Sequence, residues 1–355
     1  MNSLYQIDTG LYLVDLDLPL KGFRQFISCW IVRRNGKTIV VDPGPPSTIP
    51  VLLDAFKLLN ITTLDLILLT HIHLDHAGGT GHLVEHFPQT PVCCHPIGIP
   101  HLAEPQKLWD GSLKVLGEIA QAYGAPRAVP ADNLFYIKEN QPNSFQVKSI
   151  ETPGHASHHV CYVLDELLFA GEVAGVLLPV QSGSSQPVSR KPGLGTDHLA
   201  PFDPTRRAGK LSERALESRL SLSKPSPGEA VQHANSYYLR IATPPVFKYD
   251  VYKNSLLKAA QIEAEKVCFG HYGLRPFDKR IFELAEEQLE LWMEIISEFP
   301  HSLSEDGYRQ IFKIIRQKDP SIKTFDRLPA DIRQREIYFC LNSIKGMHEY
   351  IMRDR

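Results

Sequence analysis

The sequence predicts an α/β fold in which two mixed β-sheets stack face to face and helices cover their outer sides. Apolar runs of strand length recur along the chain and helical patterns follow several of them, so that strand–helix units occur twice. Metal-capable side chains stand just past several of these runs, and layered folds place their sites at such strand ends. With 355 residues, 43% of them hydrophobic, the chain can form one large core and a smaller unit.

The first elements are expected to be strands that lead toward the site. Residues 4–15 alternate apolar and polar side chains. Residues 26–33 and 37–41 flank Asn35-Gly36, a strong hairpin signal because both turn residues tolerate positive φ. The second strand of the hairpin ends at Asp42. This aspartate either forms a turn before the following proline or takes part in the site, and both interpretations remain open.

The highest density of metal-capable side chains follows the apolar run from Leu64 to Leu69, which has the character of a buried strand. His71, His73, Asp75 and His76 come next, within six residues. If the chain stays extended, His71, His73 and Asp75 point the same way, because side chains alternate faces along a strand. Imidazoles and a carboxylate gathered at a strand end suit a divalent metal or iron. We therefore predict a metal site here.

Three further metal-capable side chains stand at the ends of later expected strands. They are His155 after residues 144–152, Glu172 after residues 167–170, and His271 after residues 266–269. His158 and His159 follow His155 closely, and we expect them to support the site or line a pocket rather than bind metal directly.

These motifs resemble, in kind and in order, those of the metallo-β-lactamase superfamily. The pattern His71-x-His73-x-Asp75-His76 resembles the signature of that family, and Thr152-Pro153-Gly154-His155 resembles its third metal motif. Phe169-Ala170-Gly171-Glu172 resembles the motif that supplies a bridging carboxylate, with Glu where Asp is usual. Cys268-Phe269-Gly270-His271 resembles the strand end that closes the second metal site. The resemblance covers about residues 1–277 and implies the four-layer αβ/βα sandwich of the family.

The resemblance also implies a ligand set and a chemistry. It assigns His71, His73 and His155 to one metal, Asp75, His76 and His271 to a second, and Glu172 to a bridge between them. Asp42 would hold a metal-bound histidine, and Asp75 would also orient the nucleophile. The cofactors would be two divalent ions, zinc before iron or manganese. A water shared by two such ions is acidified to hydroxide, which would hydrolyse a small ester, thioester or lactone.

Two segments interrupt or follow this pattern. Residues 181–230 are rich in Ser, Pro and Gly and are expected to be a mobile insertion in the domain at 1–277. Residues 278–355 carry helical periodicity and are expected to form a helical domain that caps the cleft, with His348 at the surface. Residues 237–245 are expected to be a helix and turn near the pocket. Their Tyr237, Tyr238 and Arg240 either bind an anionic substrate group or pack.

The composition of the chain limits the kinds of partner that we expect it to bind. A formal charge of −2 argues against nucleic acid as a partner, and no apolar run approaches the roughly 20 residues of a membrane helix. Six cysteines without a CxxC spacing are expected to be small buried hydrophobes in a reducing cytoplasm. The expected partner is a small acyl compound, with no membrane; a homodimer is compatible with the sequence.

Two functions other than hydrolysis remain open. A persulfide dioxygenase with a single iron uses a similar set of ligands. A non-catalytic sensor could keep the metals while its output is a contact with another protein.

Overall fold

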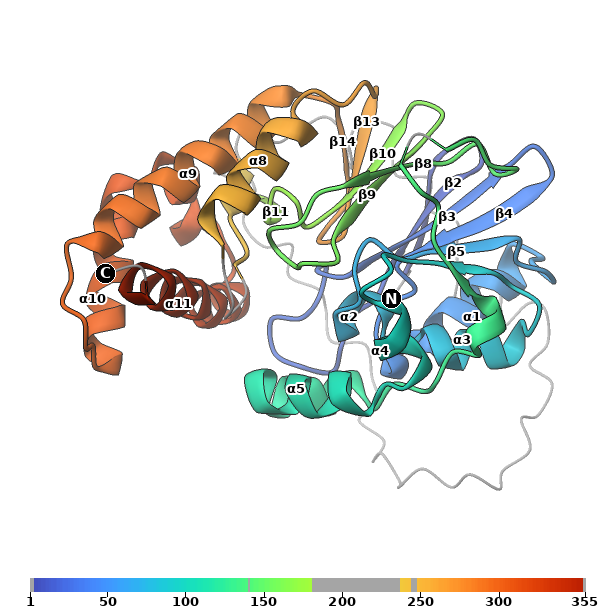
Figure 1. Ribbon diagram of the computed structural model, residues 1–355, viewed down its shortest axis with the longest axis horizontal. Helices are drawn as coiled ribbons and strands as arrows, with labels where there is room; N and C mark the ends of the chain where they lie inside the picture. The colour runs from blue at the N-terminus through green and yellow to red at the C-terminus, as the bar shows by residue number, and fades with distance from the viewer. Residues whose placement is uncertain (1–2, 140, 181–236, 244–247, 354–355) are drawn as a thin grey trace, which may run out of the picture.

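The computed structural model describes residues 3–139, 141–180, 237–243 and 248–353. The expected insertion at 181–230 lies outside the described residues. Figure 1 shows two sheets facing each other, with helices on the outer side of each and a group of helices at the C-terminal end. The αβ/βα sandwich is therefore observed as expected.

The first sheet has seven strands in the order β1-β2-β3-β4-β5-β6-β7. The strands are β1 (Leu4–Asp8), β2 (Leu11–Asp15), β3 (Ser28–Arg34), β4 (Lys37–Val41), β5 (Leu66–Leu68), β6 (Val92–Cys93) and β7 (Leu134–Phe135). Strands β1 to β4 are antiparallel neighbours, and β4 to β7 run parallel. The predicted hairpin turn joins β3 to β4, with φ of 53° at Asn35 and 73° at Gly36.

The second sheet has five strands in the order β14-β13-β10-β9-β8. The strands are β8 (Lys148–Glu151), β9 (Val160–Leu164), β10 (Leu167–Gly171), β13 (Lys266–Phe269) and β14 (Leu274–Pro276). A two-stranded sheet pairs β11 (Val176–Pro179) with β12 (Tyr237–Arg240) in antiparallel fashion.

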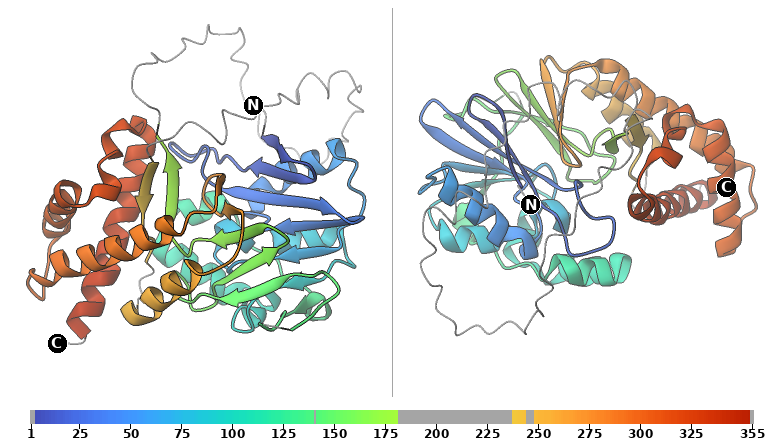
Figure 2. Two further views of the ribbon diagram at one scale, coloured as in Figure 1. Left: turned by 90° about the horizontal axis from the view of Figure 1, so that it is seen from above. Right: turned by 180° about the vertical axis from the view of Figure 1, so that it is seen from behind.

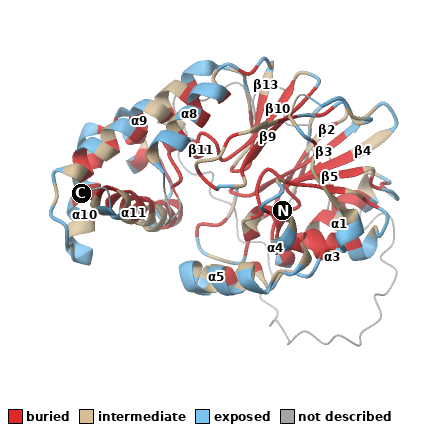
Figure 3. Cartoon of the chain, in the orientation of Figure 1, coloured by how far each residue is buried: buried red, intermediate tan, exposed pale blue. Residues whose placement is uncertain are grey.

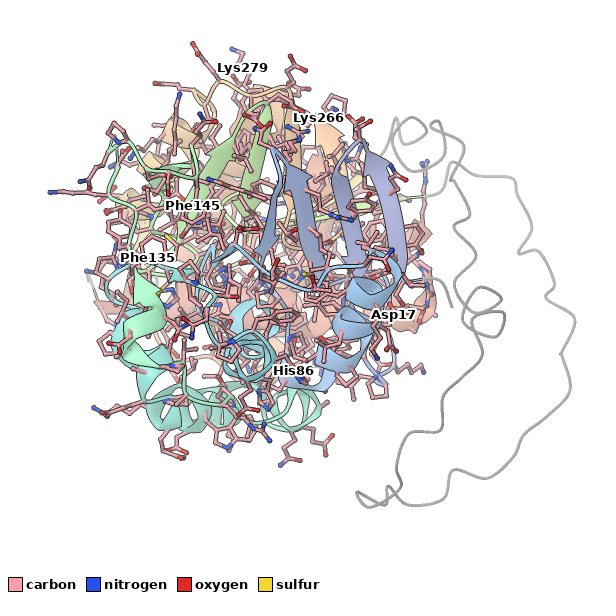
Figure 4. All side chains as sticks on the ribbon, turned by 90° about the vertical axis from the view of Figure 1, so that its right-hand side faces the viewer. Asp17, His86, Phe135, Phe145, Lys266 and Lys279 are labelled. Carbon is pink, nitrogen blue, oxygen red and sulfur yellow. The ribbon has the colours of Figure 1, made fainter. Side chains whose placement is uncertain are left out.

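The central strands are buried on both faces, which gives the molecule two hydrophobic clusters. Along β4, Ile39 and Val41 pack between the two sheets, whereas Val40 packs under the outer helices. Along β10, Leu167 and Phe169 pack between the sheets, and Leu168 lies on the helical side. Side chains fill the space between the layers (Figure 4). All six cysteines are buried and unpaired, as predicted.

Helices cover the outer faces of both sheets. On the N-terminal half these are α1 (Ile49–Leu58), α2 (Leu74–Ala77), α3 (Thr80–His86), α4 (Ile99–Ala103), α5 (Gln106–Leu116) and α6 (Glu118–Tyr123). The helices of the C-terminal half are α8 (Tyr249–Ala259), α9 (Lys279–Ser297), α10 (Glu305–Lys318) and α11 (Ala330–Arg353). Figures 2 and 3 show α9, α10 and α11 packed together beside the second sheet, with buried faces turned inward. No helix in the described part of the chain is long and apolar enough to cross a membrane.

Two expectations about the C-terminal part of the chain are wrong. Residues 237–240 form strand β12 instead of a helix, because the backbone of Tyr237 to Arg240 pairs with β11, a partner that the local sequence does not show. His348 is buried at 3% exposure rather than lying at the surface. Its two ring nitrogens contact the Tyr308 hydroxyl at 3.3 Å and the Pro300 carbonyl at 2.9 Å, so its polar atoms are satisfied among the C-terminal helices.

Candidate metal centre

The candidate ligands from the four sequence motifs come together at one edge of the two sheets. His71 and His73 follow β5, Asp75 and His76 lie in α2, His155 follows β8, Glu172 follows β10 and His271 follows β13. Their ligand atoms form two groups, each with all atoms within 4.8 Å of one another. One group is His71, His73, His155 and Glu172, and the other is Asp75, His76 and His271. Sequence segments up to 200 residues apart (71 to 271) therefore converge on one place.

Asp75 joins this cluster from a helix rather than from the expected extended chain. His73 is the N-cap of α2, so the chain ceases to be extended at that residue. Asp75 lies in the first turn of this helix, and strand alternation after His73 was a wrong prediction. Leu74 and Ala77 both pack in the hydrophobic core, and their spacing of three residues places them on one face of a helix.

The Glu172 carboxylate lies between the two groups. Its Oε2 atom is 2.8 Å from His155 Nε2 and 3.5 Å from His71 Nε2, both in the first group. Its Oε1 atom is 3.2 Å from His271 Nε2, and Oε2 is 3.6 Å from His76 Nε2, both in the second group. A carboxylate in this place faces both groups, as a bridging ligand must. The bridging of two ions by Glu172 stays a prediction.

Four of the five imidazoles are aimed by a hydrogen bond from Nδ1 to an oxygen of the protein. The acceptors are the Thr70 hydroxyl for His71 (3.1 Å), Asp42 Oδ2 for His76 (3.1 Å), the Ala242 carbonyl for His155 (2.9 Å) and the Phe26 carbonyl for His271 (3.2 Å). Such bonds fix the tautomer and leave the Nε2 lone pair free for a metal. The Nε2 atoms of His71 and His76 are buried and form no hydrogen bond within the described residues.

Asp42 supports two ligands at once. Its Oδ2 accepts a 2.6 Å hydrogen bond from the Thr70 hydroxyl as well as the one from His76, and its Oδ1 accepts from the Thr70 backbone N–H at 2.8 Å. Because the Thr70 hydroxyl donates to Asp42, it accepts from His71. The supporting role that the sequence suggested for Asp42 is therefore observed. The matching role of Thr70 was missed, although it directly precedes His71 and has a hydroxyl.

His159 positions the Glu172 backbone instead of joining the ligands. Its Nε2 accepts a 3.0 Å hydrogen bond from the Glu172 N–H, and its Nδ1 contacts the Thr152 hydroxyl at 2.8 Å. Gly171 makes this approach possible, because a Cβ there would lie 2.5 Å from His159 Nε2 and its φ is +50°. Glycine adopts that backbone conformation without a steric cost.

Burial keeps two histidines of the first group in the form that binds metal. It lowers the pKa of His71 well below its usual value and lowers that of His73 to about 4, so both are neutral at pH 7. Burial alone would raise the pKa of Glu172, but the nearby His155 and His271 hold it well below its usual value. His76 differs: burial lowers its pKa, but Asp75 and Asp42 together raise it well above normal.

The cluster lies at the floor of a pocket of about 840 Å³. Helix α11 contributes Phe339, Asn342 and Ser343 to one side, and α5 contributes Leu108 and Val115 to the other. The Tyr123 hydroxyl also lines the pocket and has no hydrogen-bond partner among the described residues, although the residue is 1% exposed. Burial, with help from Asp75 and Glu172, raises the pKa of this phenol well above normal, so it remains an O–H donor at neutral pH.

Comparison with known proteins identifies the family. The profile of the Metallo-beta-lactamase superfamily matches residues 22–271, which is more than half of the chain. The chain belongs to this superfamily. A metallo-beta-lactamase fold-containing protein of Sulfurisphaera tokodaii is 27% identical over 159 residues, which is 43% of this chain and 59% of that protein. A hydroxyacylglutathione hydrolase of Actinobacillus pleuropneumoniae is 32% identical over 146 residues, or 41% of this chain and 48% of the hydrolase.

The aligned region thus spans about half the length of these curated relatives. Solved structures extend the likeness of fold to nearly the whole chain. An archaeal metallo-beta-lactamase superfamily protein from Sulfolobus tokodaii matches with a TM-score of 0.57 at 19% identity, covering 96% of this chain and 98% of the other. A metallo-beta-lactamase family protein from Thermus thermophilus matches with a TM-score of 0.58 at 15% identity, covering 98% of this chain and 95% of the other.

Proposed function

We propose that this protein is a metal-dependent hydrolase of a small ester, thioester or lactone. The observation that carries the proposal is the convergence of five imidazoles and two carboxylates at the floor of a pocket. The similarity to hydroxyacylglutathione hydrolases supports an acyl compound as substrate.

The residues at the site fit two divalent ions. The buried Nε2 atoms of His71 and His76 lack hydrogen-bond partners within the described residues, and a buried unpaired acceptor costs free energy. Imidazole nitrogens and carboxylate oxygens are ligands that zinc prefers and that iron and manganese accept. His71, His73 and His155 would hold one ion, Asp75, His76 and His271 the second, and Glu172 both. When bound, such ions supply Lewis acidity that lowers the pKa of water.

The protein contributes a group that orients water, a hydrogen-bond donor and an apolar surface. Asp75 is partly exposed at the pocket and stands 3.6 Å from His271 Nε2 and 3.8 Å from His76 Nε2, so its carboxylate is placed both to bind and to aim a nucleophilic water. The Tyr123 hydroxyl is placed to donate a hydrogen bond to the substrate. Phe26, Ile72 and Phe339 line the pocket with apolar surface that suits the carbon chain of an acyl group.

The deciding experiment combines metal analysis with a substrate panel. We expect close to two ions per chain after expression with zinc, iron or manganese, and hydrolysis of at least one thioester, ester or lactone. Protein without metal would contradict the proposal. Turnover of glutathione persulfide that requires oxygen, or of phosphodiesters alone, would leave the metal site intact and reject the acyl assignment. A metal-loaded protein that turns over nothing and retains a small molecule would indicate a sensor.

A further inference from the structure

A buried cluster of charges adjoins the pocket and carries more positive than negative charge. Arg240, at the end of β12, donates from Nε to Glu336 Oε2 at 2.8 Å, and Arg335 donates from Nε to Glu336 Oε1 at 2.9 Å. Arg240 is 2% exposed, Arg335 is 4% exposed and Glu336 is fully buried. Two guanidiniums and one carboxylate leave one uncompensated positive charge. Burying such a charge is expensive unless an anion or a hydrogen-bonding partner meets it.

The two arginines differ in what lies around them. Arg335 is enclosed by protein, because Nη1 donates to the Gly22 carbonyl at 2.6 Å and its guanidinium covers the Phe26 ring at 3.8 Å. Arg240 uses Nε for Glu336 and Nη1 for the Ile241 carbonyl at 3.2 Å. A guanidinium has five N–H groups. The Nη2 atom of Arg240 has no hydrogen-bond partner among the described residues, and Arg240 lines the pocket. Arg335 Nη2 also forms no regular hydrogen bond, but it is buried and lies 2.9 Å from Glu336 Oε1, within the charge cluster. Only Arg240 therefore combines a free donor with a place at the wall of the pocket.

Arg240 is held close to the metal centre and in a fixed position. The Ala242 carbonyl accepts from His155, and two residues of extended chain span at most about 7 Å between Arg240 and Ala242. The buried Gln288 side chain clamps the same strand, accepting from the Ile241 N–H at 2.6 Å and donating to the Leu239 carbonyl at 2.9 Å. A preorganised donor loses little entropy when a ligand binds.

We propose that Arg240 anchors an anion subsite, and that the substrate is an acyl compound carrying a carboxylate or phosphate a short distance from the bond that is cleaved. This inference rests on the proposed function for the cleavage step alone. A planar guanidinium with a free edge matches the two oxygens of such a group. The Asn342 and Ser343 side chains of α11 line the same pocket. Of the three residues suggested by the sequence, Tyr238 is fully buried and Tyr237 does not line the pocket, so the structure favours Arg240.

The first test measures binding without turnover. Glutarate and inorganic phosphate are titrated into the metal-loaded protein by calorimetry, which distinguishes a carboxylate subsite from a phosphate subsite. The double variant Arg240→Gln/Glu336→Gln removes one charge of each sign, so the net charge of the protein does not change. The control Arg34→Gln/Glu166→Gln removes another, more exposed Arg–Glu ion pair, 2.6 Å between Nη2 and Oε1, that does not line this pocket. We expect the first variant to bind the preferred anion about 10- to 100-fold more weakly and the control to bind like the wild type.

The second test measures selectivity. The ratio of kcat/KM for the 4-nitrophenyl monoester of glutaric acid to that for 4-nitrophenyl pentanoate is expected to exceed ten, mainly through KM, and to fall toward one in the double variant. A merely structural role would lower both rates and leave the ratio unchanged. If the double variant does not fold, the same tests are made on Arg240→Lys, which keeps the charge beside Glu336. This variant should give an intermediate loss of binding and selectivity.

The outcomes separate the two proposals. Anion binding that depends on Arg240, with no ester cleaved by the wild type, would support the subsite and reject the hydrolase. Ester cleavage with no preference for the anionic substrate, or anion binding that is equal in wild type, double variant and Arg240→Lys, would overturn the subsite and leave the hydrolase standing.

Discussion

The two sides of the pocket are built in opposite ways. On one side, α11 contributes eleven buried residues, among them Glu336, which ties the helix to Arg240 of β12. On the other side, α5 has no buried residue, although Leu108 and Trp109 rest partly on the core. A hydrogen bond from the Tyr338 hydroxyl to the Val115 carbonyl, at 3.3 Å, joins α11 to α5. Local stability follows burial, so α11 can hold chemistry in place while α5 is expected to open at a lower cost in free energy.

The largest expected effect concerns Asp75 of α2, at the floor of the pocket between the two sides. Asp75→Ala removes a candidate ligand and the group that aims the nucleophile, so kcat/KM should fall by several orders of magnitude, beyond the ~10²–10³ lost with a single oxyanion donor. Steady-state kinetics with elemental analysis measure this. A variant that keeps activity within about tenfold of the wild type would show that Asp75 has neither role.

The next effect concerns the link between α11 and β12. Glu336→Gln leaves two buried guanidiniums without their carboxylate, so the free energy of unfolding should fall by about 3–5 kcal/mol. Urea unfolding monitored by circular dichroism measures the change. The exposed pair of Lys345 and Glu305 serves as the control, because Lys345→Gln should cost less than about 1 kcal/mol. Equal effects in the two variants would mean that the cluster does not set the stability of this side.

A smaller effect is expected at the end of α5. Gly117 has φ +55° and ψ −119°, a conformation that only glycine adopts readily, and a Cβ there would meet no atom within 4 Å. Gly117→Ala therefore tests backbone strain without a clash, and should destabilise α5 locally by about 1–3 kcal/mol. Hydrogen exchange should be faster in α5 than in α11 in the wild type, and the substitution should widen this difference. Equal protection of α5 and α11 would contradict the expected difference in their local stability.

The smallest effect concerns a buried donor on the α5 side of the pocket. Tyr123→Phe removes the hydroxyl that faces the pocket but keeps the ring in the core, so kcat/KM should fall by about three- to tenfold, the value of one neutral hydrogen bond. Stability should change little, since the hydroxyl has no partner among the described residues. An unchanged kcat/KM would show that the substrate does not reach this residue.

The metal motifs could be predicted from sequence because each one is local. Candidate ligands such as His155 and Glu172 stand just past apolar runs, and the strand ends bring them to one edge. The failures depend on partners far away in sequence. Strand β12 forms because it pairs with β11, and the burial of His348 depends on Tyr308 and Pro300, neither of which a local pattern can show. The sequence named Arg240 as a candidate, but its ion pair with Glu336, 96 residues away, could not be predicted from a local pattern.

The two-sided burial of β4 has a consequence for how the strands find their alignment. In a strand with one buried face, a slip of one residue exposes the apolar side chains, and this penalty sets the register. In β4, such a slip would exchange Ile39 and Val41 for Val40, one apolar surface for another. Alignment with β5 then depends on polar contacts beyond the strand ends, where the Asp42 N–H donates to the Leu68 carbonyl at 3.0 Å and the Thr70 N–H donates to Asp42 at 2.8 Å. Asp42, which orients two imidazoles, therefore also helps to set the register between β4 and β5.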